Sequence, residues 1–187
     1  MEKFYQGMLG VSSNFVGCGN CFRLDSYKGC SFGCKYCFAN NRSGGYVHDF
    51  RVGSVDRLRT RMRKAIDLGD RNNLVNDMIG CRVPLHLGGM SDPLQDCEFK
   101  YGITLGYLGV SREYGYPINI STKFGGFLDR GYWDVLDPMI HTFSISLCGV
   151  SDGFIRRWEQ RTPLFCDRVR FIKELKDRGF WVGLRIG

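Results

Sequence analysis

The sequence of 187 residues lacks the long hydrophobic run of a membrane span, since no stretch reaches about 18 consecutive apolar residues. Its first residues, MEKFYQGMLGVSSNF, lack the basic-then-apolar order of a signal peptide. It also has no internal repeat, no low-complexity tract and no linker rich in Pro, Gly or Ser. We therefore expect a single globular domain in the cytoplasm, without membrane contact.

Histidine is scarce, and His48, His86 and His141 show no ligand spacing, so we expect structural histidines. Positive charge and cysteine are plentiful instead. Twenty-six Lys and Arg against nineteen Asp and Glu give a net charge of +7, which favours an anionic partner. Nine cysteines, an odd number in a chain without an export signal, argue against a closed disulfide framework and for metal ligation or thiol chemistry.

The cysteines fall into two groups. Five lie within twenty positions, as Cys18, Cys21, Cys30, Cys34 and Cys37. The other four lie within or beside apolar stretches, where a free cysteine usually acts as a small hydrophobe. We therefore expect packing roles for Cys81, Cys97, Cys148 and Cys166.

Short apolar runs alternate with longer segments of helical spacing, which is typical of repeated βα units and predicts an α/β fold. The expected strands are Cys21–Tyr27, Val83–Gly88, Pro117–Thr122, Thr142–Cys148 and Phe180–Ile186. The expected helices cover residues 54–68, 94–114 and 163–178. Strands in this alternation are expected to be parallel with right-handed crossovers, in an open doubly wound sheet or a barrel arc.

Helix-terminal residues support two of these helices. Ser54 is placed to cap the first helix and Gly69 to end it. Thr162 and Pro163 precede the third helix, and Gly179 follows it, in positions that suit a cap, a first helical residue and a stop.

Polar residues and cysteines follow the expected strands, where ligands of parallel sheets gather. The cysteine cluster follows the first strand, Gly88–Asp92 the second, Lys123 the third and Ser146–Gly149 the fourth. We therefore expect these strand ends to converge on one face.

Cys30, Cys34 and Cys37 form a C-x3-C-x2-C pattern. A structural zinc site closes with four ligands, whereas an iron-sulfur cluster held by three cysteines leaves one iron open for a small molecule. Gly29 and Gly33 would loosen the loop, so that three sulfurs can surround one cluster.

This loop, including the aromatic Tyr36, resembles that of the radical S-adenosylmethionine (SAM) enzymes. The resemblance implies a 4Fe-4S cluster on Cys30, Cys34 and Cys37, whose unique iron chelates the amino and carboxylate groups of S-adenosylmethionine. In that family, electron transfer yields methionine and a 5′-deoxyadenosyl radical, which abstracts hydrogen from the substrate. It also implies a reductant such as flavodoxin or ferredoxin as a partner.

Later segments extend the resemblance over roughly residues 22 to 187. SDP, STK, FSIS, WEQRTPLFCDRV and RGFWVGLRIG are similar to the subgroup of spore photoproduct lyase and related DNA-repair-photolyase-like proteins. The implied fold is a partial (β/α) barrel of about five parallel strands, a radical SAM core over residues 22–187 that would be truncated at its C-terminus. Residues 1–21 would form an N-terminal segment with a C-x2-C pair.

The resemblance also implies cofactor contacts. Tyr36 and Phe38, the latter in place of a common tyrosine, would lie by the adenosyl group. Lys123 and Ser146 would contact the carboxylate or the ribose, and Glu159 and Arg168 would belong to a later polar set.

The glycine pair after the second strand, Gly88 and Gly89, would meet the methionine end of the cofactor with its backbone. Met90 stands where the family often has an acidic residue, which leaves Ser91 and Asp92 as candidates. A helix-start charge is an equal alternative for Asp92.

One departure concerns the substrate. In spore photoproduct lyase a cysteine near the second strand end donates hydrogen, but the corresponding place here, close to Gly89, has no thiol. Cys148 could supply one from the fourth strand end, although a structural role is favoured. A nucleic acid lesion is a candidate substrate, and the reaction would be lyase-like.

Two alternatives stay open. Cys18 and Cys21, with Cys34 and Cys37, form two C-x2-C pairs, as in a zinc-bearing nucleic-acid-binding module. The second alternative is a catalytically silent fragment, because the chain stops directly after the fifth expected strand. That strand would be a bare edge, so we expect self-association, a covering partner or a truncated product.

Overall fold

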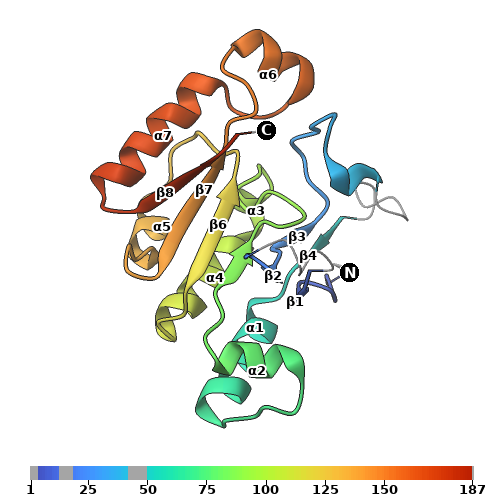
Figure 1. Ribbon diagram of the computed structural model, residues 1–187, viewed down its shortest axis with the longest axis vertical. Helices are drawn as coiled ribbons and strands as arrows, with labels where there is room; N and C mark the ends of the chain where they lie inside the picture. Colours follow the sequence, from blue (N-terminus) through green and yellow to red (C-terminus); the bar gives the residue numbers. More distant parts are fainter. Residues whose placement is uncertain (1–3, 13–18, 42–49, 187) are drawn as a thin grey trace.

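The computed structural model describes residues 4–12, 19–41 and 50–186, and its centre is a six-stranded sheet (Figure 1). The strands follow the order β1-β2-β5-β6-β7-β8. The pairs from β2 to β8 are parallel, and β1 pairs with β2 antiparallel. The predicted α/β class and the five parallel strands are therefore confirmed. The strands are β1 (Leu9–Val11), β2 (Phe22–Leu24), β5 (Leu85–Leu87), β6 (Ile118–Thr122), β7 (His141–Ser146) and β8 (Trp181–Arg185).

The first expected strand, residues 21–27, is divided in two. Strand β2 ends at Leu24, and β3 (Tyr27–Lys28) pairs with β4 (Arg51–Val52) in a separate sheet. The division falls at Asp25 and Ser26, two buried polar residues that each have a partner outside the main sheet. The Ser26 hydroxyl lies 2.7 Å from that of Thr104, for example. Polar residues that need such partners turn the chain out of the sheet.

Helix α1 (Val55–Met62) begins and ends as its sequence predicts. The Ser54 hydroxyl accepts the backbone N–H of Arg57, and the helix continues as a π-helical turn, η3 (Arg63–Asp67), up to Gly69 with φ of 64°. A short helix that was not expected, α2 (Leu74–Gly80), follows.

The single helix expected over residues 94–114 is wrong. It is two helices, α3 (Glu98–Tyr101) and α4 (Ile103–Glu113), divided at Gly102 with φ of 61°. The buried Glu98 carboxylate accepts the backbone N–H groups of Thr104 at 2.9 Å and Leu105 at 3.0 Å. It therefore satisfies two backbone N–H groups at the start of α4, and the apolar spacing of the sequence runs through this break.

Three helices follow: α5 (Arg130–Val135), α6 (Asp152–Trp158) and α7 (Phe165–Asp177). Helix α7 starts two residues later than expected, and Thr162 is not its cap. The Thr162 hydroxyl instead bonds Glu159 and Arg168, while the backbone N–H of Leu164 donates to Asp167. Gly179, with φ of 84°, ends the helix as predicted.

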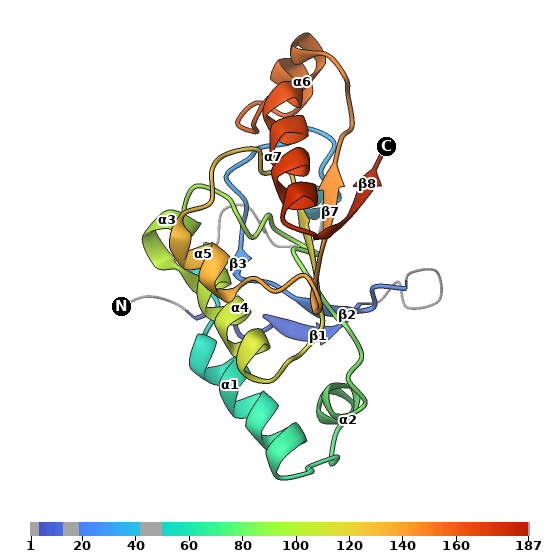
Figure 2. The same cartoon turned by 90° about the vertical axis from the view of Figure 1, so that its left-hand side faces the viewer.

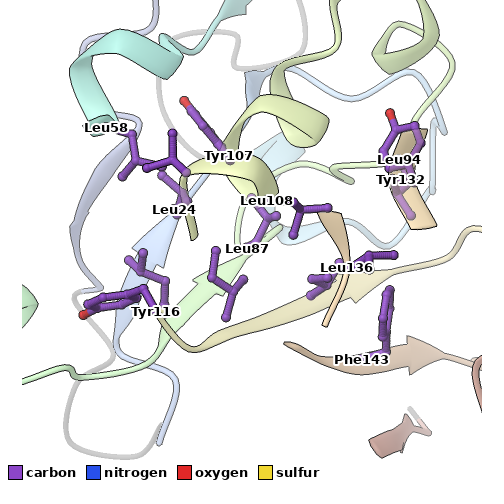
Figure 3. Close-up of a cluster of buried hydrophobic side chains, with 14 of the residues drawn as sticks. Leu24, Leu58, Leu87, Leu94, Tyr107, Leu108, Tyr116, Tyr132, Leu136 and Phe143 are labelled. Atoms are coloured by element: carbon purple, nitrogen blue, oxygen red, sulfur yellow. The ribbon is translucent and has the colours of Figure 1, made fainter. Parts of the chain in front are cut away.

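The two faces of the sheet differ in chemistry. Helices α4, α5 and α7 lie on one side of it (Figure 2), over a buried apolar cluster (Figure 3). Leu87, Ile120 and Phe143 pair across adjacent strands on this apolar face. Phe143 meets Phe171 of α7 edge-on, with ring centroids 6.0 Å apart.

The alternate residues are polar, because successive side chains of a strand point to opposite faces. His86, Asn119 and Thr142 pair across the same three strands. At the end of the sheet, no described residue pairs with the outer edge of β8. Within the described ranges, no helix is long and apolar enough to cross a bilayer.

Candidate functional site

The carboxyl ends of the parallel strands meet around a cavity of about 400 Å³. The loop after β3 and the ends of β5, β6, β7 and β8 all contribute to its lining. The structure therefore brings together every metal and cofactor residue that the sequence predicts: Cys30, Cys34, Cys37, Tyr36, Phe38, Gly88, Gly89, Ser91, Asp92, Lys123 and Ser146.

The cysteine loop is held along one side by the segment after α6. Cys34 forms an isolated antiparallel bridge with Glu159, and the N–H of Lys35 donates to the carbonyl of Trp158 at 2.8 Å. Gly29 and Gly33 have φ of 94° and 61°, a conformation that favours glycine. The loop thus has a fixed shape and directs three cysteine side chains, those of Cys30, Cys34 and Cys37, to the cavity.

Side chains from the segment that follows β5 hold the other side of the cysteine loop. Gln95, which is buried, accepts the N–H of Ser31 at 2.7 Å and donates to the carbonyl of Gly29 at 3.1 Å. The Ser91 hydroxyl donates to the carbonyl of Tyr27 at 2.7 Å. Gln95 is not among the residues predicted from the sequence, because nothing near it in the chain indicates a partner 66 residues away.

Burial keeps two of the thiols protonated. It raises the pKa of Cys30 to about 11, with the nearby charge of Asp92 adding to the effect. It also raises the pKa of Cys34 to about 12, although Lys123 works in the opposite direction. A bound cation would displace these protons, because the thiolate is the form that ligates metal.

The three thiols line one cavity, which is the arrangement that a cluster held by three cysteines requires. Among the described residues, no three Cys, His, Asp or Glu side chains lie close enough together to hold one metal ion. Each cysteine of an iron-sulfur cluster binds its own iron, so the thiols need only surround one cavity. The zinc alternative depends on Cys18, which lies outside the described residues.

The glycine side of the cavity is the segment Gly88–Asp92. Gly88 has φ of 95°, and a Cβ on it would lie 2.4 Å from the carbonyl oxygen of Ser121. The buried Asp25 accepts the N–H of Met90 at 2.8 Å. Burial raises the pKa of Asp25 to about 6, although Arg23 and the backbone N–H groups of the segment work in the opposite direction. Asp25 was not predicted; its place directly after β2 is the available signal.

Asp92 is bound from three directions. Its carboxylate accepts the N–H of Lys123 at 2.7 Å, the hydroxyl of Thr122 at 2.7 Å and the N–H of Leu94 at 3.0 Å. Burial raises the pKa of Asp92. The hydrogen bonds act in the opposite direction, but they come from neutral donors and do not outweigh the effect of burial. The Asp92 carboxylate thus joins the segment after β5 to the end of β6.

The charged side of the cavity consists of Tyr36, Lys123, Glu159 and Arg168. Glu159 accepts hydrogen bonds from the Tyr36 hydroxyl and the Arg168 guanidinium, and Lys123 Nζ lies 3.5 Å from its Oε1. Burial works to raise the pKa of Glu159, but Tyr36, Lys123 and Arg168 together hold it below its usual value. The predicted polar set therefore lies behind the lining.

Arg168 connects this group to the sheet. It is fully buried and donates to the carbonyls of Ser146 at 2.9 Å and Pro163 at 3.0 Å. It therefore fixes the end of β7 against the start of α7.

The scattered cysteines differ from their prediction. Cys81 and Cys166 are exposed, because each lies at a helix end on the solvent side, so they do not pack in a core. Cys97 is partly buried. Cys148 lines the cavity, with its Sγ 3.9 Å from Lys123 Nζ.

Comparison with known proteins adds a fold relationship. No family model matches the sequence. Over 102 residues, 54% of the chain, it is 29% identical to uncharacterized proteins of Mycobacterium bovis and Mycobacterium tuberculosis, and the match covers 29% of their length.

Solved structures of spore photoproduct lyase share the fold. One, complexed with dinucleoside spore photoproduct, has a TM-score of 0.70 at 15% identity, over 98% of this chain and 49% of that chain. A mutant lyase with bound AdoMet and dinucleoside spore photoproduct has a TM-score of 0.68 at 15% identity, over 97% of this chain and 48% of that chain. The chain thus has the fold of about half of a lyase chain.

Proposed function

We propose that the protein is a radical SAM enzyme. The observation that carries this proposal is the convergence of three cysteine side chains, Cys30, Cys34 and Cys37, on one cavity with residues of four further strand ends. A fold shared with spore photoproduct lyase, one structure of which contains AdoMet, supports it.

In the proposed function the three cysteines hold a 4Fe-4S cluster and leave one iron open. When bound, the cluster supplies the electron that cleaves S-adenosylmethionine to methionine and a 5′-deoxyadenosyl radical, which abstracts hydrogen from the substrate. The loop contacts of Gln95 and Glu159 hold the thiols in place before the cluster binds.

The remaining residues receive S-adenosylmethionine. Tyr36 and Phe38 lie by the adenosyl group, and Lys123 and Ser146 contact the carboxylate or the ribose. The backbones of Gly88 and Gly89 meet the methionine end. Ser91 and Asp92 act by holding the backbone around the cavity. The Ser91 side chain binds the carbonyl of Tyr27, and the Asp92 side chain binds the N–H of Lys123 directly after β6.

Several finer points belong to the same proposal. The sheet, with residues 22–187, forms part of a radical SAM barrel. The substrate is a nucleic acid lesion and the reaction is lyase-like, and a flavodoxin or ferredoxin supplies the electron. A partner or a second copy covers the outer edge of β8.

The test is anaerobic reconstitution with iron and sulfide, followed by reductant and S-adenosylmethionine. We expect a cluster absorbance, an electron paramagnetic resonance signal after reduction and formation of 5′-deoxyadenosine. Cys37→Ala should abolish all three. Cys81→Ala, which alters an exposed thiol elsewhere, should leave them unchanged.

Metal analysis of the same samples separates the alternatives. One zinc per chain without iron would establish the zinc module instead. A well-folded protein that gives neither a cluster nor 5′-deoxyadenosine would overturn the proposal.

A further inference from the structure

The polar face of the sheet continues from the cavity as a hydrogen-bonding surface. Asn119 donates to the hydroxyl of Thr142 at 2.8 Å and accepts from that of Ser144 at 3.1 Å. Ser121 and Ser146, each two residues further along the same strands, lie on the same face and line the cavity. A molecule that enters the cavity therefore meets a polar floor.

Arg185 ends the fifth parallel strand at this floor. It pairs in register with Ser146 and lines the cavity. Its guanidinium lies 3.4 Å from the hydroxyl oxygen of Ser121, which in turn lies 2.7 Å from Nε2 of His86. Burial and the charge of Arg185 lower the pKa of His86 to about 4, so this ring is neutral and can accept the hydroxyl proton.

Arg185 is solvent-exposed at the rim of the cavity, and no described carboxylate neutralises its charge. Among the described residues that line the cavity, the cations are Lys123 and Arg185. Lys123 is paired with Glu159, but Arg185 forms no ion pair with a described carboxylate. The lining carboxylate, Asp92, is already bound by backbone and hydroxyl donors.

We infer that Arg185 binds an anionic group, a phosphate or a carboxylate, of a molecule in the cavity, and that Ser121 positions it. A guanidinium presents five donors in a planar fork, so one bond to Ser121 leaves a pair for bidentate contact with such a group. Which molecule carries this anionic group follows from the proposed function, and to that extent the inference rests on it. A phosphate belongs to the substrate, and a carboxylate belongs to S-adenosylmethionine.

The experiment measures binding rather than turnover. Inorganic phosphate is titrated at low salt and followed by the broadening of its phosphorus resonance. S-adenosylmethionine and its decarboxylated analogue are titrated by calorimetry. The variants are Arg185→Met and Arg185→Lys, with Arg130→Met as a control of equal charge change whose side chain, on α5, is 94% exposed.

We expect Arg185→Met to weaken the anionic ligand about tenfold, the loss of one charge-assisted contact, and Arg185→Lys to weaken it less. Arg130→Met should have no effect. Ser121→Ala should lower the affinity by a smaller factor, which Arg185→Met should remove, because both act through one guanidinium.

The two arms identify the source of the anion. A loss confined to phosphate assigns Arg185 to the substrate. A loss for S-adenosylmethionine but not for its decarboxylated analogue assigns it to the cofactor. Equal affinities of wild type and Arg185→Met in both arms, or absence of binding by the wild type, overturn the inference. Phosphate binding that depends on Arg185 in a protein that assembles no cluster would contradict only the proposed function.

Discussion

The glycine side and the charged side of the cavity each contain a hydrogen-bonded carboxylate, the partly buried Asp92 and the buried Glu159, and the two are held in opposite ways. Asp92 is bound mainly by neutral donors, and burial raises its pKa. Glu159 is bound by Arg168, Lys123 and Tyr36, and its pKa is lowered. Lys123 joins the two sides, with its backbone N–H on Asp92 and its ammonium on Glu159.

The difference teaches how one cavity combines a fixed shape with a charge. Neutral donors fix the position of the glycine side without adding charge beside the thiols. The charged side keeps its ions paired, so breaking one pair exposes a buried charge to an apolar environment. The two sides should therefore respond differently to the same kind of substitution.

The largest difference is expected from two isosteric substitutions, Glu159→Gln and Asp92→Asn. Glu159→Gln should lower the free energy of unfolding by about 4 kcal/mol, because Arg168 is then buried without a counter-ion. Asp92→Asn should cost about 1–2 kcal/mol, because a donor such as the N–H of Lys123 then loses its carboxylate acceptor, whereas no opposite charge is left buried without a partner. Urea denaturation of the metal-free variants measures both. Equal costs would contradict the comparison.

A second pair of variants tests the fixed shape of the glycine side. Gly88→Ala should lower the free energy of unfolding by about 3 kcal/mol, since its φ of 95° is strained for alanine and the new Cβ meets the Ser121 carbonyl. Gly89→Ala should cost less, about 1–2 kcal/mol, because its backbone has no positive φ, although the Arg23 side chain must shift where the new Cβ meets its Cγ and Cδ. Thermal unfolding of the two variants decides it, and a tolerated Gly88→Ala would mean that the segment can move.

A pH dependence is also expected on the glycine side. The folded-state pKa of Asp25, about 6, lies above its ordinary value of 3.8, so the folded protein holds this proton more tightly than the unfolded chain. The contribution of Asp25 to stability is present below pH 4 and is lost as the pH rises to about 6.

The free energy of unfolding of Asp25→Asn minus that of wild type should therefore increase between pH 4 and 6, by at most about 3 kcal/mol. His86 and His141, whose pKa values burial lowers to about 4, act in the opposite direction but cancel in this difference. Denaturation at several pH values measures it. A constant difference would show that Asp25 ionises in the folded state as it does in water.

The sequence predicts the strands and the residues at their ends because both depend on local pattern. Period-two alternation locates β6 and β7, and the ends of these strands locate Lys123 and Ser146. What it does not predict depends on partners distant in the chain. Asp25 binds a segment 65 residues away, and Arg185 gains its place from the register of β8 with β7. Side chains of this kind are located by the assembled sheet.

The outer edge of β8 gives the cavity a second route of control. Arg185 lies on that strand, so any strand that pairs with the edge would lie directly beside the cavity. If pairing along this edge moves Arg185, edge pairing and ligand binding are thermodynamically linked, and each changes the affinity of the other by the same factor. An assembly that forms along β8 would in this way act as an effector of the site, and the ligand would report on the assembly.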